Sequence, residues 1–273
     1  MPARHAVDHS DLAFSDDFGL GYLDRTKWNV RATDHVVNDE QQAYVDSEET
    51  IYVADGLPGA DGPVLVLHPR YRPGYVAEDG QRFDFISGRI DTSHHFGFRY
   101  GSASARIQLP TGAGVWPAFW AMGYGRWPQT GEIDIMEYVG EADWVSSAVH
   151  GPGYSGEGGL VNKLFFPDGS DATDWHVYTV NRGPDEMTFE VDGAVAYRVR
   201  RPMTEFFGTW QFDDEKFLIL NCALGGTYPF KTNGIDSPYY GIAQETVDRI
   251  RDDEVRVLID WVSVEPAKTA ESQ

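Results

Sequence analysis

The stretch "GEIDIMEYVG", residues 131–140, places three carboxylates within six residues, at Glu132, Asp134 and Glu137. Side chains along a regular β-strand alternate between two faces, so Glu132 and Asp134 share a face. Glu137 comes five residues after Glu132 and falls on the opposite face, together with both isoleucines. Either one acid is buried among apolar side chains at a cost of several kcal/mol, or the strand is irregular.

A β-bulge near Ile135 or Met136 would resolve this conflict, because one extra residue turns Glu137 onto the face of the other two acids. Two carboxyl groups ~5–5.5 Å apart are what retaining glycoside hydrolysis requires. One attacks the anomeric carbon as a carboxylate, and the other donates a proton to the leaving oxygen and then activates water. Asp134 would hydrogen-bond to the nucleophile and separate the two glutamate pKa values by charge coupling. An exposed acidic strand and a calcium cluster are the alternatives, and the apolar flanks and β-forming composition argue against both.

The rest of the chain predicts an all-β fold. Turn sequences such as "ADGLPGADGP", "PTGAG" and "GPGYSGEGG" separate short runs rich in β-branched and aromatic residues, which is typical of a sandwich or barrel. We expect a hairpin turning at Asp192-Gly193 and one short helix over residues 243–252. No linker or repeat is visible, so we expect residues 1–273 to form one domain, with loosely ordered tails at 1–11 and 267–273.

A tryptophan-rich strand precedes the acids. In "VWPAFWAM", residues 115–122, Trp116 and Trp120 share one face, and Trp127 follows in the next loop. Both faces of this strand are apolar, so it is either buried on both sides or lines a groove. Flat aromatic rings beside carboxylates suit a sugar, because rings stack on C–H faces while polar groups bind hydroxyls. Core tryptophans remain the alternative.

Composition limits the partners. The 273 residues include 22 Lys and Arg against 43 Asp and Glu, a net charge of −21, which disfavours nucleic acid and anionic membranes but not a neutral polymer. No apolar run is long enough for a transmembrane helix. The single cysteine, Cys222, lies in the apolar run "FLILNCALGG", where we expect a buried, unreactive thiol. We expect a monomer.

The chain resembles glycoside hydrolase family sixteen, in particular its bacterial laminarinase-like endo-β-1,3-glucanases. The resemblance is carried by "LPTGAGVWPAFWAMG", "GEIDIMEYVG" and "AVHGPGYSG", with weaker similarity in "SDDFGLGYLDRTKWN", "NDEQQAY", "ISGRIDT" and "IDWVSV". It covers roughly residues 12–265. It implies a β-jelly roll, a sandwich of two antiparallel sheets with an open concave cleft.

The resemblance also assigns roles to residues. It implies that Glu132 is the nucleophile, Glu137 the acid/base and Asp134 their assistant. It suggests three aromatic sugar platforms and three polar residues close to the substrate, which are Trp116, Trp120, Trp127, Arg89, Asn38 and His150. The chemistry requires no cofactor.

A structural calcium ion is a further implication of the resemblance. Relatives hold it on the convex side, and the corresponding ligands here would be Asp17, Asp260 and a backbone oxygen near Gly56. The "DD" of "FSDDFG" replaces the usual Asp-Glu pair, which shortens one ligand arm.

These observations predict a retaining endo-hydrolase of β-1,3-glucosidic bonds in laminarin-like glucans. A mixed-linkage β-1,3-1,4-glucanase, a galactan hydrolase and a glucan-binding protein of the same fold remain alternatives. Because polymeric glucans lie outside cells, we expect an extracellular protein, although no signal peptide is visible in this sequence.

Overall fold

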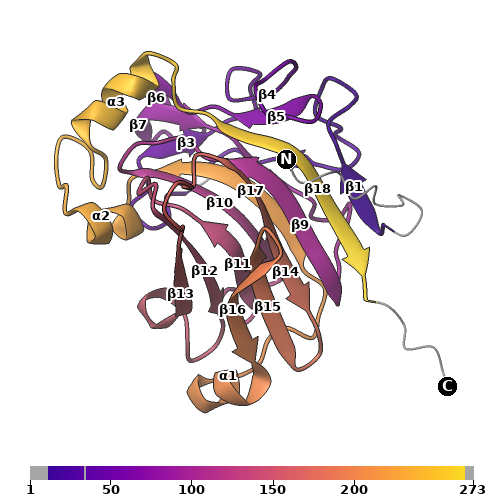
Figure 1. The fold of residues 1–273 in the computed structure, drawn as a ribbon. Coiled ribbons are helices and arrows are strands. Elements are labelled where there is room, and N and C mark those ends of the chain that lie inside the picture. Colours follow the sequence, from indigo (N-terminus) through magenta and orange to yellow (C-terminus); the bar gives the residue numbers. More distant parts are fainter. Residues whose placement is uncertain (1–11, 34, 268–273) are drawn as a thin grey trace.

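The computed structural model describes residues 12–33 and 35–267 and confirms the all-β jelly roll (Figure 1). The predicted tails, 1–11 and 267–273, lie outside the described residues except for Ala267, whose amide donates to the Tyr100 carbonyl (3.3 Å). The extent of the single domain stays a prediction.

Two large antiparallel sheets form the body of the molecule. The eight-stranded sheet runs in the order β16-β15-β14-β9-β18-β5-β4, with β1 paired to β18. Its strands are β1 (Phe14–Asp16), β4 (Ile51–Ala54), β5 (Val64–Leu67), β9 (Gly101–Gln108), β14 (Trp175–Arg182), β15 (Glu186–Val191), β16 (Ala194–Arg200) and β18 (Val257–Pro266).

The seven-stranded sheet runs in the order β13-β12-β11-β10-β17-β8-β2. Its strands are β2 (Asn29–Val30), β8 (Arg89–Asp91), β10 (Val115–Met122), β11 (Glu132–Glu137), β12 (Trp144–His150), β13 (Leu160–Phe165) and β17 (Phe217–Leu224). The predicted Trp-rich and acid-rich strands, β10 and β11, are therefore direct neighbours at the middle of this sheet.

A third, small sheet was not predicted. It contains β3 (Gln42–Tyr44), β6 (Arg70–Val76) and β7 (Arg82–Ser87), and the β3–β7 pair is parallel. A parallel pair joins segments distant in sequence, so no local turn signal announces it.

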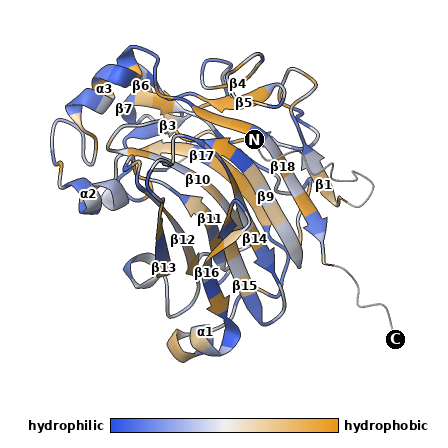
Figure 2. Cartoon of the chain, viewed as in Figure 1, coloured by the Kyte–Doolittle hydropathy of each residue, from blue (hydrophilic) through white to orange (hydrophobic). Residues whose placement is uncertain are grey.

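The core lies between the two large sheets. On β9 alternate residues Ala103, Ala105 and Ile107 are fully buried and belong to one core cluster, which also contains Phe119 of β10 and Ile133 of β11. Figure 2 shows apolar residues along the strands of both sheets and polar residues on helix α3, whereas helix α1 carries apolar residues. Because alternate side chains of each strand point into the core, the remaining side chains lie on the outer face of each sheet, where they can contact solvent or a ligand.

Local predictions for the hairpin and the helix are confirmed. The β15–β16 hairpin turns at Asp192 (φ 52°) and Gly193 (φ 77°), and two consecutive positive φ angles match a type I′ turn. Helix α3 (Gln244–Arg251) buries Val247 and Ile250 on one face. Helices α1 (Arg201–Phe207) and α2 (Thr227–Asn233) and the 3₁₀ turn η2 (Gly156–Gly158) were not predicted, because each is too short for a helical period to show.

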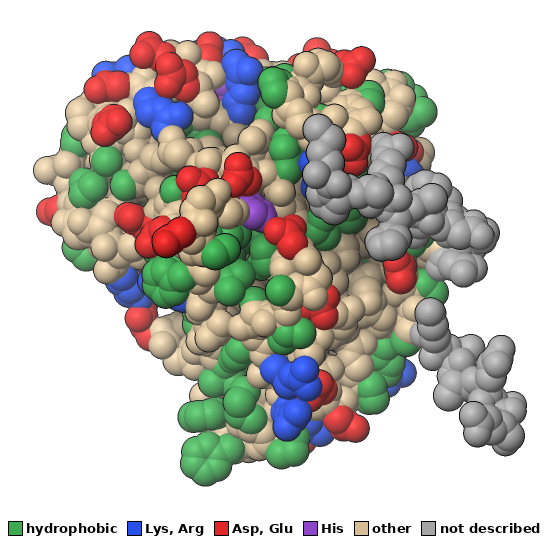
Figure 3. Space-filling model, viewed as in Figure 1, with side chains coloured by type: hydrophobic (Ala, Val, Ile, Leu, Met, Phe, Trp, Pro, Cys, Tyr) green, Lys and Arg blue, Asp and Glu red, His purple; other side chains and the backbone are tan. Residues whose placement is uncertain are grey.

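The surface agrees with the acidic composition. Figure 3 shows Asp and Glu side chains spread over the visible face, and a group of hydrophobic side chains at the lower end, over α1. That group includes Met203, Phe206 and Phe207, with exposures of 38%, 84% and 51%. Among the described residues, no helix is both long and apolar enough to span a membrane.

Candidate active site

The strand irregularity predicted from the acid spacing is present. In the β10–β11 ladder Phe119 pairs with Met136 and Trp120 pairs with Asp134, so Ile135 is the extra residue of a β-bulge. The β11–β12 ladder shows the same break, between Asp134 and Glu137. The bulge keeps Ile135 and Met136 buried together in the core cluster and returns Glu137 to the other face of the sheet.

The three acids of β11 therefore form one row on the face of the seven-stranded sheet that looks away from the core. We call Glu132, Asp134 and Glu137 the acid row. On β10 their direct partners are Met122, Trp120 and Ala118 in the same order, and on β12 they are His150, Ala148 and Ser146. The acid row is thus enclosed by strands on both sides.

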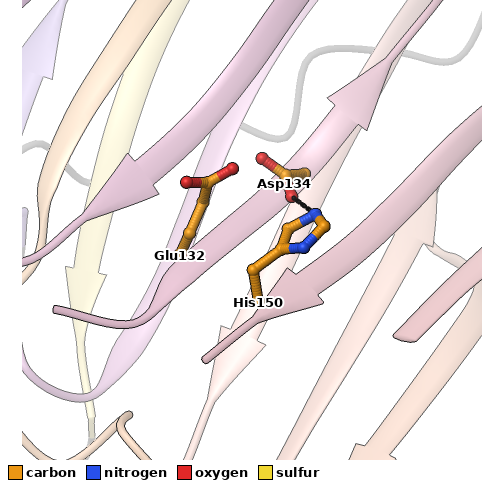
Figure 4. Close-up of side chains that lie close together, drawn as sticks. All are labelled: Glu132, Asp134 and His150. Carbon is orange, nitrogen blue, oxygen red and sulfur yellow. Dashed lines mark ion pairs between the residues drawn. The ribbon is translucent and has the colours of Figure 1, made fainter. Parts of the chain in front are cut away.

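His150 approaches the middle of the acid row. Its Nε2 lies 3.3 Å from Asp134 Oδ2, and Figure 4 shows the imidazole on the strand beside the two acids, pointing toward Asp134. Ligand atoms of Glu132, Asp134 and His150 all lie within 4.8 Å of one another. The prediction that His150 lies beside the catalytic centre agrees with this placement.

Burial dominates the protonation of the acid row. Desolvation raises the pKa of Glu132 to about 8, and the charge of Asp134 adds to the effect, while His150 and a hydrogen bond from Trp127 oppose it. Desolvation also raises the pKa of Asp134 to about 7, although a hydrogen bond from Glu132 favours its ionised form. Desolvation, followed by the Asp134 charge, raises the pKa of Glu137 to about 8. The acid row therefore retains protons at neutral pH, which is the condition for a carboxylic acid to act as a proton donor.

Trp116 contacts the acid row through its nitrogen. Its Nε1 donates to Glu137 Oε1 at 3.1 Å, and this hydrogen bond lowers the pKa of Glu137 against the larger effect of burial. The indole meets the ring of Tyr228 edge-on, with centroids 5.7 Å apart. The Tyr228 hydroxyl lies 3.0 Å from Ser146 Oγ, on the residue paired with Glu137. Trp116 is therefore also a hydrogen-bond donor to Glu137, a role that the sequence pattern did not predict.

The sequence pattern does not reveal Tyr228, for a physical reason. It lies in the first turn of α2, directly after Gly225-Gly226, and no β-strand period extends to it. Burial raises its pKa to about 12, with Glu137 contributing. The local signal is a tyrosine one residue beyond a pair of glycines, after the end of a buried strand.

Trp120 and Arg89 lie together farther along the same face. Trp120 Nε1 donates to Asn221 Oδ1 (2.8 Å), and the Arg89 guanidinium lies 5.0 Å from the Trp120 ring centroid and 6.0 Å from that of Tyr44. A cavity of about 400 Å³ begins here, and Arg89, Tyr44 and the carboxyl group of Glu40 belong to its lining. Burial raises the pKa of Glu40, opposed by Gln42, Arg89 and other hydrogen-bonding groups. Arg89 lines this cavity and Trp120 lies against Arg89, while their predicted contact with substrate stays a prediction.

Trp127 and Asn38 lie in loops. Trp127, in the β10–β11 connection, is 44% exposed and its ring centroid is 6.5 Å from that of His150, so its ring is available to a ligand beside the acid row. Asn38 has φ 53° and lies in a turn. Its carbonyl accepts from the Thr227 amide (2.7 Å), which ties this turn to α2.

The residues expected to bind calcium form different contacts. The Asp260 carboxylate, 3% exposed, accepts from Arg106 and from the Asp61 amide (3.2 and 3.3 Å). Asp17 is exposed and accepts from the Gly19 amide (3.1 Å), and the amide of Gly56 donates to the side chain of Asp55. A guanidinium at the carboxylate does not fit a divalent ion, so the calcium site stays a prediction without support from these donors. Within the described ranges, the one group of three or more side chains with metal-ligand spacing is Glu132, Asp134 and His150.

A curved β-sandwich with buried, proton-retaining acids between aromatic rings defines a class of protein that handles carbohydrate. Residues 28–216 match the family model described as glycosyl hydrolases family 16, and the chain belongs to this family.

Known relatives agree with this assignment. The chain is 32% identical over 254 residues to a glucan endo-1,3-beta-glucosidase A1 of Niallia circulans, a match covering 83% of this chain and 36% of that protein. It is 34% identical over 289 residues to a beta-1,3-glucan-binding protein of Penaeus monodon, covering 83% and 77%. The crystal structure of an endo-beta-1,3-glucanase from Pyrococcus furiosus superposes with a TM-score of 0.79 at 29% identity, covering 93% of each chain.

Proposed function

We propose that this protein is a retaining endo-β-1,3-glucanase that acts on laminarin-like glucans. The observation that carries the proposal is the bulge at Ile135, which brings Glu132, Asp134 and Glu137 onto one face of the sheet. A strand used only for structure gains nothing from burying three acids, because each raised pKa is a cost to folding above pH ~5. The relative of Niallia circulans and the structure from Pyrococcus furiosus, both named for 1,3-β-glucan cleavage, support the choice of substrate.

The first chemical step uses the two glutamates as opposites. A carboxylate oxygen of Glu132 forms a bond to the anomeric carbon while the glycosidic C–O bond breaks. Glu137, which is protonated because burial raises its pKa, transfers its proton to the departing oxygen. The products are a glycosyl ester on Glu132 and a free sugar hydroxyl on the leaving chain.

The second step reverses the roles. Glu137, now a carboxylate, removes a proton from a water molecule as the water oxygen bonds to the anomeric carbon. The ester bond to Glu132 breaks and releases its carboxylate. Two inversions at one carbon give net retention of configuration.

Asp134 controls where the negative charge lies. It hydrogen-bonds to Glu132 and is close enough to both glutamates to raise both pKa values. When the proton shared by Glu132 and Asp134 sits on Asp134, Glu132 is free to attack and is stabilised by the same hydrogen bond. His150, 3.3 Å from Asp134, limits the negative charge that accumulates at this point.

The ring-lined face supports a polymeric substrate. Trp127 is exposed on one side of the acid row. A cavity of about 400 Å³, with Arg89 in its lining, lies farther along the same face. A neutral glucan suits a protein of net charge −21, because it experiences no charge repulsion. We further propose that the protein works outside the cell, since such polymers are extracellular, and that it is a monomer.

The test is a pair of isosteric variants assayed for reducing-sugar release from laminarin. We expect Glu132→Gln and Glu137→Gln each to lose at least ~10³-fold in kcat while keeping the wild-type circular dichroism spectrum. Proton NMR of the first product formed should show the β-anomer before mutarotation. A variant with near-wild-type turnover, or an α-anomer as first product, would contradict the assigned roles.

Glucan binding without hydrolysis is the second candidate, favoured by the relative from Penaeus monodon. It requires only the aromatic rings and the polar groups near Arg89. A wild-type protein that binds laminarin in calorimetry but releases no reducing ends over hours would select this function. Mixed β-1,3-1,4-glucan and agar in the same assay would identify a different linkage or sugar.

A further inference from the structure

A second irregular strand position lies on the opposite side of the molecule, on the outer face of the eight-stranded sheet. In the β18–β9 ladder Ile259 pairs with Ile107 and Trp261 pairs with Arg106, so Asp260 is an extra residue. This bulge aims the Asp260 carboxylate at Arg106, whose side chain leaves the sheet away from the core. Asp260 is 3% exposed and the Arg106 side chain 19% exposed, so the pair is largely withdrawn from water.

Arg106 uses its guanidinium on three sides. One nitrogen donates to Asp260 Oδ2, and another donates to the carbonyl of Gly59 at 2.9 Å. The face of the guanidinium lies over the indole of Trp175, with its carbon 4.6 Å from the ring centroid. The Asp61 carboxylate lies 3.9 Å away and adds a second, weaker charge contact.

Arg106 and its two partners, Trp175 and Asp260, together hold one loop segment, residues 58–61. Trp175 Nε1 donates to the Pro58 carbonyl at 3.1 Å, and the Asp61 amide donates to both oxygens of Asp260. A Cβ at Gly59 would lie 2.9 Å from the Trp175 indole, so the loop backbone lies directly against the ring. The loop is thus joined to β9, β14 and β18 through one carboxylate, one indole and one guanidinium.

We propose that Arg106 is the built-in cation of this site and takes the structural place that the family resemblance assigns to calcium. A buried carboxylate and a backbone carbonyl converging on one point are the oxygen ligands that calcium prefers. Here a guanidinium already satisfies both, in a fixed planar geometry that a spherical ion cannot share. The 58–61 loop is therefore fastened without a metal.

The calcium test uses thermal unfolding of the full chain, first stripped with EDTA and then given Ca²⁺ or Mg²⁺ at about 10 mM. We expect the three Tm values to agree within about 1 °C. An ion that binds with a Kd about a thousandfold below that concentration would raise Tm by roughly 8 °C. A rise of several degrees with calcium but not with magnesium would overturn the proposal.

The arginine test replaces the cation. Arg106→Met keeps an unbranched apolar stem but leaves Asp260 buried without a counter-charge, so Tm should fall by roughly 6 °C or more. Arg198→Met is the matched control, because its pair with Glu186 is exposed, and its Tm should change by less than about 2 °C. Adding Asp260→Asn to Arg106→Met should recover part of the loss. Equal losses in Arg106→Met and the control would overturn the proposal, and if the arginine variant does not fold, the calcium titration of the wild type still decides.

Discussion

Replacing Trp116 by phenylalanine separates two roles that one indole can play in this site. The sequence pattern made Trp116 a stacking platform for sugar, whereas the structure shows its Nε1 donating to the carboxyl group of Glu137 at 3.1 Å. Phenylalanine keeps an aromatic face at the same position but removes the N–H donor together with one ring of the indole. The variant therefore tests the hydrogen bond while an aromatic platform remains.

The expected effect is on the pH profile. A hydrogen bond to a charged group contributes about 1.5–3 kcal/mol, and 1.36 kcal/mol corresponds to one pKa unit. This bond stabilises the ionised form of Glu137, so its loss should raise the pKa of Glu137 further, from about 8, by about one unit. Because Glu137 must be protonated in the first step, the alkaline limb of kcat/KM should move to higher pH by about one unit. The acid limb, which reports ionisation of Glu132, should stay in place.

The assay is kcat/KM on a β-1,3-linked oligosaccharide across the pH range of stability. Trp120→Phe is the matched control, since it loses the same N–H group but from a bond to neutral Asn221. Its pH limbs should coincide with those of the wild type. An unchanged alkaline limb in Trp116→Phe, combined with a raised KM, would refute the hydrogen-bond argument and leave only the platform.

Three other measurements follow from the protonation and burial of single residues. Glu137→Gln should be more stable than wild type at pH 8 by about 2–4 kcal/mol in guanidinium melts, because a carboxyl group whose folded pKa is raised to about 8 destabilises the folded protein as pH rises from about 4.5. Below pH ~4 the two proteins should have the same free energy of unfolding. A difference that is constant across pH would contradict the argument from the buried charge of Glu137. His150→Gln removes the electrostatic effect of His150 that lowers the pKa of Glu132, so the acid limb of kcat/KM should move to higher pH by about half a unit or more. An unchanged acid limb would show that His150 acts only through packing. Cys222 is fully buried and burial raises the pKa of its thiol, so iodoacetamide should label it only in denaturant; labelling of the native protein in minutes would show that the strand opens.

The bulge in β11 could be predicted because two sequence rules conflicted at that point. Strand parity put Glu137 with the isoleucines, and the cost of burying an unpaired acid made that arrangement untenable. A single extra residue is the smallest correction, and the ladder shows it at Ile135. Conflicts of this kind are informative wherever a strongly polar residue falls on the wrong face of a strand.

Contacts between segments distant in sequence could not be predicted in the same way. Tyr228 reaches the acid row from α2, which is too short for a helical period, and the parallel pair β3–β7 has no connecting turn. Asn38 lies in a turn with a positive φ, and its carbonyl accepts a hydrogen bond from the amide of Thr227, which is distant in sequence. In each case the decisive partner lies far along the chain, so local alternation carries no information about it.

The bulges in β11 and β18 have the same geometry but opposite electrostatic consequences. In β11 the extra residue gathers three carboxyl groups, and among the described residues no Lys or Arg forms an ion pair with them, so burial raises their pKa values and protons remain available. In β18 the extra residue delivers one carboxylate to Arg106, and the charge is neutralised where it forms. Asp134 and Asp260 are buried to a similar extent, so the feature that distinguishes the two sites is the guanidinium beside Asp260. An arginine placed beside Glu137, at the position of Ser146, should abolish proton donation by holding Glu137 ionised, and the alkaline limb of kcat/KM would then disappear together with the activity on unactivated glucan.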